Sequence, residues 1–207
     1  MGLFELYEEI KHHLLHDMRP SEDLHSIYEM PLLRKYPFIM LYNLKKTEQS
    51  PEHHPEGNVW NHTLLVVDEA AERKAESKNA DVLMMAALLH DIGKPVTTRL
   101  RKGKYTAYGH DKEGAKLCRD FLKCFTADQA YMKEVTGLVR YHMQILFVVK
   151  DSPFADVQGM KENTDLNEIA LLGLCDRLGR TISKKVEEKE IENINIFLQK
   201  CNSTILG

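Results

Sequence analysis

The chain has 207 residues, 43% of them hydrophobic, and a formal net charge of −3. This length and apolar content suffice for one substantial core, and the missing basic excess argues against proteins that coat nucleic acids or membrane surfaces. The four cysteines form no CxxC pair, and the sequence shows neither a secretory leader nor an apolar run near twenty residues. We therefore expect a reduced, cytoplasmic protein that does not associate with membranes.

The N-terminal quarter combines one regular helix with an irregular extension. Apolar residues at helical spacing predict a helix over 3–16 that ends before Pro20. Prolines interrupt the following stretch, 17–58, so we expect short helical turns and loops there. So long an irregular stretch is unusual in a compact domain unless it builds the walls of an active site. Residues 1–50 are thus interpreted as an extension packed on the core.

A pair of helices follows. Residues 60–78 have an apolar stripe opposite charged residues, with Asn61 as the expected N-terminal cap. Residues 81–89 are apolar on every side and too few to span a membrane, which predicts a buried core helix. His90 and Asp91 end this helix, and Gly93 is placed where a left-handed C-terminal cap would lie.

The second half of the chain begins with a basic loop, 94–104, which contains lysines and arginines and no acidic residue. Lys150 to Asn163 is expected to be a loop as well. Periodic patterns predict helices over 111–125, 128–142, 165–180 and 182–199. Because no convincing alternating strand is found, the predicted class is an all-α helical bundle.

A charged Asp beside a His at the end of a buried helix is costly unless a positive charge neutralises it, and a divalent metal would do so. Further histidines and an aspartate lie near the ends of other predicted helices, where side chains of antiparallel helices can converge. Imidazoles and carboxylates suit Fe, Mn, Ni or Zn, and a carboxylate can bridge two ions. Spacing alone does not establish such a site. The candidate ligands are His62, His90, Asp91, His110, His142 and Asp176.

These residues resemble the HD superfamily of metal-dependent phosphohydrolases, whose pattern is a His, a His-Asp pair and a distant Asp. His62, the block "HDIGKP" at 90–95 and Asp176 match this pattern in order. His110 and His142 fall where binuclear members of the superfamily supply two further histidines. The resemblance implies an HD metal-binding domain over 51–182, followed by an amphipathic C-terminal helix within 183–207.

A closer similarity is to the HD domain attached to bacterial CCA-adding tRNA nucleotidyltransferases. The similar blocks are "HHPEGNVWNHT" at 53–63, "HDIGKPVTT" at 90–98, "YGHDKEGA" at 108–115 and "CDRLGR" at 175–180. The 207 residues contain no nucleotidyltransferase domain with a Gly-Ser and paired-Asp nucleotide site, so nucleotide addition is not expected of them. His53 and His54 lie beside the motif, and the sequence assigns them no role.

The resemblance implies hydrolysis of a phosphoester by water bound to one or two divalent ions, Mg included. His62, His90, Asp91 and Asp176 would hold the first ion, and Asp91 would bridge to a second ion on His110 and His142. Lys94 would offset negative charge on the phosphoryl group. The candidates for binding the substrate phosphate are Thr98, Arg99 and Arg180.

A nearly neutral chain with a single basic loop favours a nucleotide, a 2′,3′-cyclic phosphate or an RNA end as the substrate over a long duplex. Two alternatives stay open. The same superfamily includes di-iron oxygenases with a similar six-ligand arrangement, and a helical module could bind a metal or a nucleotide without catalysis. The basic loop favours a phosphorylated substrate. The native metal and the oligomeric state are not defined by the sequence.

Overall fold

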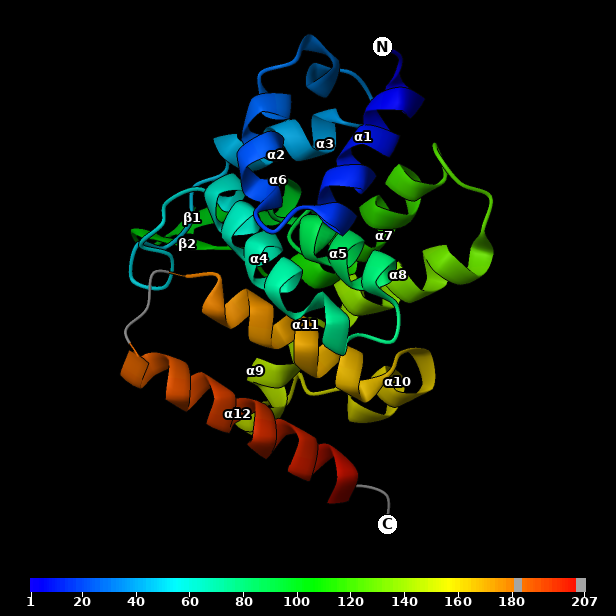
Figure 1. Ribbon diagram of the computed structural model, residues 1–207. Coiled ribbons are helices and arrows are strands. Elements are labelled where there is room, and N and C mark those ends of the chain that lie inside the picture. The colour runs from blue at the N-terminus through cyan, green and yellow to red at the C-terminus, as the bar shows by residue number, and fades with distance from the viewer. Residues whose placement is uncertain (181–183, 204–207) are drawn as a thin grey trace.

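The structure, a computed structural model, describes residues 1–180 and 184–203 and is built around the apolar helix α5 (Ala80–Leu89) (Figure 1). Every α5 residue from Val82 to Leu89 is buried. This confirms the predicted core helix and explains its composition, because neighbouring helices cover α5 on several sides. These neighbours are α1 (Leu3–His16), α4 (Val59–Arg73), α8 (Gln129–Tyr141) and α11 (Leu166–Leu178).

The part of the N-terminal extension that follows α1 is more regular than expected, and its first helix packs against α1 and α4. Pro20 does not only follow the end of α1; it also occupies the first position of α2 (Pro20–Tyr28). Proline suits this position because its fixed φ is helical and no N–H is needed there. The expected short turns are found farther on, as η1 (Pro31–Arg34), α3 (Ile39–Tyr42) and η2 (Asn43–Lys46).

The start of α4 differs from the prediction by one turn. Asn58, and not Asn61, caps the helix, since its Oδ1 accepts a hydrogen bond from the Asn61 backbone N–H at 3.0 Å. His62 still lies in the first turn of α4. A short 3-10 helix, η3 (Lys74–Glu76), follows this helix.

A small hairpin replaces part of the predicted basic loop. After α6 (Lys94–Thr97), β1 (Arg99–Arg101) pairs antiparallel with β2 (Lys104–Thr106). Lys102 and Gly103 have positive φ angles of 49° and 75°, as a two-residue hairpin turn requires. Strands of three residues are too short to show alternation in the sequence. They are the only strands in the described ranges, so the all-α class is confirmed.

The second half of the chain contains more helix than predicted. A helix, α10 (Val157–Asn163), occupies the end of the expected loop at 150–163 because Asp156 caps it by accepting from the Gly159 N–H at 3.0 Å. The other helices are α7 (His110–Leu122), α9 (Gln144–Val149) and α12 (Lys184–Ser203). The predicted helix start at Ile182 and the domain boundary at 182/183 lie outside the described residues. None of the helices seen here has the length and hydropathy of a membrane span.

Gly93 does not adopt the left-handed conformation that its position suggested. Its φ of −81° and ψ of −16° are right-handed helical. A glycine is needed there for space instead: a Cβ atom would lie 2.1 Å from the His110 carbonyl oxygen and 2.6 Å from the Gly114 backbone nitrogen. This close approach places the start of α7 directly against the chain that leaves α5.

We predict that Gly93→Ala lowers the free energy of unfolding by about 3 kcal/mol, at the upper end of overpacking costs, because two stretches of backbone must separate. Gly2→Ala is the matched control, since nothing lies within 4 Å of the added methyl group. Urea unfolding with a chelator present measures both variants without any contribution from metal. Equal stabilities would contradict the packing role of Gly93.

Candidate metal centre

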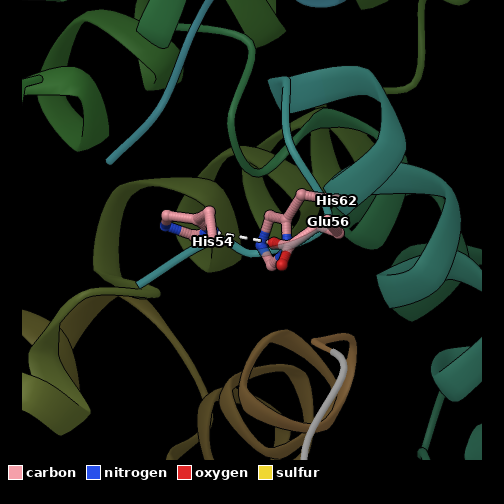
Figure 2. Close-up of side chains that lie close together, drawn as sticks. All are labelled: His54, Glu56 and His62. Atoms are coloured by element: carbon pink, nitrogen blue, oxygen red, sulfur yellow. Dashed lines mark hydrogen bonds and ion pairs between the residues drawn. The ribbon is translucent and has the colours of Figure 1, made fainter. Parts of the chain in front are cut away.

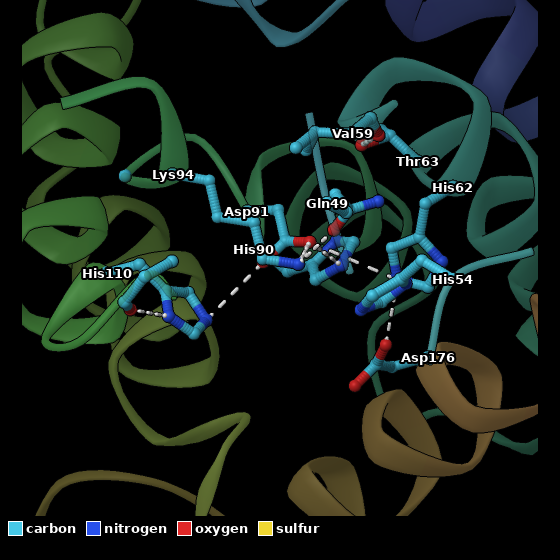
Figure 3. Close-up of polar contacts among 12 residues, drawn as sticks. Gln49, His54, Val59, His62, Thr63, His90, Asp91, Lys94, His110 and Asp176 are labelled. Atoms are coloured by element: carbon cyan, nitrogen blue, oxygen red, sulfur yellow. Dashed lines mark hydrogen bonds and ion pairs between the residues drawn. The ribbon is translucent and has the colours of Figure 1, made fainter. Parts of the chain in front are cut away.

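The structure brings the predicted ligands together from the ends of several helices (Figure 3). His62 lies in the first turn of α4, and His90 and Asp91 directly follow α5. The remaining ligands come from the start of α7, the end of α8 and the last turn of α11, namely His110, His142 and Asp176. The six side chains form two groups of three.

The first group consists of His62, His90 and Asp176, whose donor atoms lie within 4.8 Å of one another. His62 Nε2 is 2.9 Å from Asp176 Oδ1. Burial alone would lower the pKa of His62, but hydrogen bonds with Asp176 and Glu56 raise it overall. A cation between the Nε2 and Oδ1 atoms would replace the proton that they share.

The second group consists of Asp91, His110 and His142 and forms a compact triangle. The Nε2 atoms of His110 and His142 are 3.1 Å apart, and they lie 3.5 Å and 3.8 Å from Asp91 Oδ1. Ligand atoms about 2.1 Å from one ion lie roughly 3 to 4 Å apart. The triangle therefore has the size of one face of a coordination sphere.

Asp91 stands between the two groups and turns one oxygen toward each. Its Oδ1 faces the second group, and its Oδ2 lies 3.2 Å from His90 Nε2 and 3.9 Å from His62 Nε2. Burial alone would raise the pKa of the Asp91 carboxyl, but the Lys94 ammonium and the His90 ring outweigh burial and hold it well below its usual range. The carboxylate is thus ionised and has the geometry of a bridging ligand.

Three of the histidines are held in the tautomer that a metal ligand needs. In each, Nδ1 donates to a backbone carbonyl three residues earlier, which leaves the Nε2 lone pair facing the centre. The distances are 2.9 Å for His90 to Ala87, 2.7 Å for His110 to Ala107 and 2.7 Å for His142 to Val139. Within the described part of the chain, His90 Nε2 has no hydrogen-bond partner.

The electrostatics of the histidines also fit a cation. Burial, and then the neighbouring His110, lower the pKa of His142 to about 4, and burial likewise lowers the pKa of His110. Both rings are therefore neutral at pH 7, and their Nε2 lone pairs face each other 3.1 Å apart. A divalent ion would convert this repulsion into two bonds. Neutral imidazoles with ionised carboxylates suit a divalent transition metal.

The predicted substrate-binding residues differ in how close they come to these groups. Lys94 Nζ lies 2.6 Å from Asp91 Oδ2, and Arg180 Nη2 lies 3.5 Å from Asp176 Oδ1. Thr98 is half-buried, and Arg99 is exposed on β1 with its guanidinium donating to the Thr98 carbonyl at 2.7 Å. No hydrogen bond or ion pair among the described residues joins either side chain to the ligands.

Three polar residues of the irregular segment before α4, to which sequence reasoning assigned no role, also lie at the centre. Gln49 Oε1 accepts a hydrogen bond from Lys94 Nζ at 2.6 Å. Glu56 Oε1 accepts from His54 Nδ1 at 2.8 Å and lies 2.9 Å from His62 Nδ1 (Figure 2). The block at 53–63 contained His54 and Glu56, but no periodicity indicates which polar residue of an irregular segment turns inward.

The charge states of this group are set by burial and hydrogen bonds together. Burial would raise the pKa of the Glu56 carboxyl, but hydrogen bonds from His54 and His62 lower it to about 2. Burial lowers the pKa of His54 to about 4. At neutral pH an ionised Glu56 therefore accepts a hydrogen bond from a neutral His54.

The model of the HD domain matches residues 59–181, which is more than half of the chain. The chain thus belongs to the HD domain family, which lies within the superfamily of metal-dependent phosphohydrolases. The match runs from the start of α4 to beyond Asp176 and so contains all six candidate ligands.

Among curated proteins, the chain is similar to CCA-adding enzymes, as the sequence blocks indicated. It is 29% identical to the multifunctional CCA protein of Methylococcus capsulatus over 91% of this chain and 38% of that protein. It is 36% identical to that of Actinobacillus pleuropneumoniae serotype 5b over 40% of this chain and 19% of that protein. It is also 34% identical to the CC-adding tRNA nucleotidyltransferase of Thermus thermophilus over 42% of this chain and 20% of that protein. The chain spans less than two fifths of each relative.

We predict that the purified protein binds about two transition-metal ions per chain, because the ligands form two groups joined by Asp91. His110→Ala or His142→Ala should lower the count to about one, since each removes a ligand of the second group only. Elemental analysis of protein purified without added metal measures the count, with exposed His12 changed to Ala as control. An unchanged count in both variants would remove the second ion.

Proposed function

We propose that the protein is a phosphohydrolase that cleaves a phosphomonoester or phosphodiester with metal-activated water. The observation that carries the proposal is the placement of Asp91, with one oxygen toward each histidine group and the Lys94 ammonium at 2.6 Å. Membership of the HD family supports it. The proposed substrates are a nucleotide, a 2′,3′-cyclic phosphate or the phosphate at an RNA end.

Each ligand has a proposed role. His62, His90, Asp91 and Asp176 would hold the first ion, with Asp91 shared by a second ion on His110 and His142. The ions would be Fe, Mn, Ni or Zn, with Mg possible. When bound, such an ion supplies Lewis acidity, which lowers the pKa of water from 15.7 to about 7.

Lys94 and its neighbours would bind and stabilise the phosphoryl group. Lys94 is only 11% exposed, so its charge acts in a poorly solvated place, and Gln49 holds its ammonium near Asp91. Arg180 lies at the edge of the first group. Thr98 and Arg99 would contact the substrate farther out, at the base of the hairpin.

The size of the basic region supports a small or single-stranded substrate. The exposed hairpin residues Arg99, Arg101, Lys102 and Lys104 are close together, whereas the whole chain carries a charge of −3. A surface that follows a long duplex would need a larger basic face. The similarity to enzymes named for tRNA is in keeping with an RNA end as substrate.

We predict that His90→Ala and Asp91→Ala abolish hydrolysis, and that Asp91→Ala loses more metal because its carboxylate faces both groups. The assay is phosphate release from nucleotides, 2′,3′-cyclic nucleotides and simple esters, with metal content and oxygen consumption measured on the same samples. His12→Ala should retain full activity. Turnover of either variant at the wild-type rate would refute the proposal, and substrate-dependent oxygen consumption without phosphate release would replace it with an oxygenase.

We further predict different kinetic effects for Lys94 and Arg99. Lys94→Ala should lower kcat by about 100- to 1000-fold with metal content intact, because its charge is needed where negative charge develops. Arg99→Ala should mainly raise KM, as expected when binding is lost equally in the ground and transition states. Steady-state kinetics measures both, with exposed Lys133 changed to Gln as control. Wild-type constants for Lys94→Ala would contradict its role.

A further inference from the structure

Glu56 is a buried carboxylate that lies outside the six candidate ligands. Its side chain is 4% exposed, although it belongs to the irregular segment before α4. Its Oε1 faces two imidazoles, His54 Nδ1 at 2.8 Å and His62 Nδ1 at 2.9 Å (Figure 2). A buried carboxylate is costly unless hydrogen bonds satisfy it, and among the described residues only Oε1 has such partners, while Oε2 is buried without one.

His62 needs such a partner because of its place in the fold. His90, His110 and His142 lie at helix ends, where each Nδ1 reaches the carbonyl three residues earlier. His62 instead lies inside the first turn of α4, where the corresponding carbonyl belongs to Val59. That oxygen accepts a hydrogen bond from Thr63 Oγ1 at 2.9 Å. The His62 ring must therefore be held by groups from other parts of the chain.

Two groups face the Nδ1 atom of His62. One is Glu56 Oε1, and the other is the Gly179 carbonyl oxygen at 3.2 Å. With the Nδ1 proton directed to them, the Nε2 atom points to Asp176 Oδ1 at 2.9 Å. Carboxylates that bind the second nitrogen of a ligand histidine fix its tautomer and increase its basicity.

We propose that Glu56 is a positioning residue for the metal centre, which holds His62 as a ligand of the first ion, and that His54 keeps the Glu56 carboxylate in place. This inference rests on the metal binding that the proposed function requires. The family match begins at residue 59, so Glu56 would support the metal centre from outside the matched region.

His54, Glu56 and His62 could instead hold an ion of their own, since their donor atoms lie within 4.8 Å of one another. The distances of 2.8 Å and 2.9 Å from Oε1 to the two Nδ1 atoms favour hydrogen bonds, because they match ordinary N–H···O geometry. An ion would also take the Nδ1 lone pair of His62. The experiment below separates these two arrangements.

The test is the affinity of the metal-free protein for Mn²⁺ and Zn²⁺, measured by calorimetry and chelator competition without substrate. Glu56→Ala should weaken the affinity for the first ion, which His62 binds, about 10- to 100-fold. The affinity for the second ion, on His110 and His142, should not change. Glu56→Gln should weaken the affinity for the first ion less, because an amide oxygen can still accept from His62. It also serves as the second variant if Glu56→Ala folds poorly by circular dichroism.

His54 provides an independent arm of the same test. His54→Ala should weaken the first ion several-fold, and His54→Asn should restore affinity because its amide N–H can replace the Nδ1 donor. The matched controls are Glu48→Gln and His53→Asn, which make the same changes at exposed positions of the same segment. Both controls should bind metal like the wild-type protein.

Three results would overturn the proposal. Glu56→Ala could bind metal with wild-type affinity, or the Glu48→Gln control could lose as much affinity as Glu56→Gln. The wild-type protein could also bind three ions, of which the Glu56 variants lose one completely. Because no substrate is present, the outcome is separate from the proposed function. Weaker metal binding in a protein that hydrolyses no ester would defeat the hydrolase proposal and support the role of Glu56. Wild-type metal affinity in a Glu56→Ala protein that hydrolyses esters would support the hydrolase proposal and refute the role of Glu56.

Discussion

The ionised carboxylate of Asp91, buried at the end of an apolar helix, is the constraint on which the rest of the structure depends. An isolated buried charge of this kind would be strongly destabilising, so positive charge or metal must lie beside it. Lys94 contacts one oxygen, and histidines of both groups surround the carboxylate. Helices α4 and α7 begin near this centre, and helices α8 and α11 end near it, so their side chains gather around the carboxylate.

The close packing of the Gly93 backbone against α7 makes that convergence possible. The Gly93 backbone touches the start of α7 so closely that no Cβ atom would fit, and this contact brings His110 within 3.5 Å of Asp91. The apolar surface of α5 meanwhile holds α4, α8 and α11 around it. Stability and metal binding are coupled in such a centre, because the ligands meet only in the folded chain and a bound ion favours that state.

The irregular segment before α4, which contains Gln49 and Glu56, takes part in the centre. Gln49 contacts Lys94, and Glu56 contacts His62, so one irregular segment reaches both a proposed catalytic cation and a candidate ligand. This use agrees with the expectation that a long irregular stretch forms the walls of a site. It also means that side chains before the family match influence how the matched residues are held.

The sequence alone determined the helical class, the core helix α5 and the set of candidate ligands, because apolar runs and the order of the His and Asp residues can be read directly from the chain. It misassigned the cap of α4, the conformation of Gly93 and the helix α10, and it did not show the hairpin, because short elements leave little periodic signal. The family resemblance implied two groups of ligands joined by Asp91, but only the tertiary structure gave the distances between them and showed which Asp91 oxygen faces which group. The tertiary structure also decided that Glu56 turns inward while Arg99 stays exposed, since contacts between segments distant in sequence set these positions.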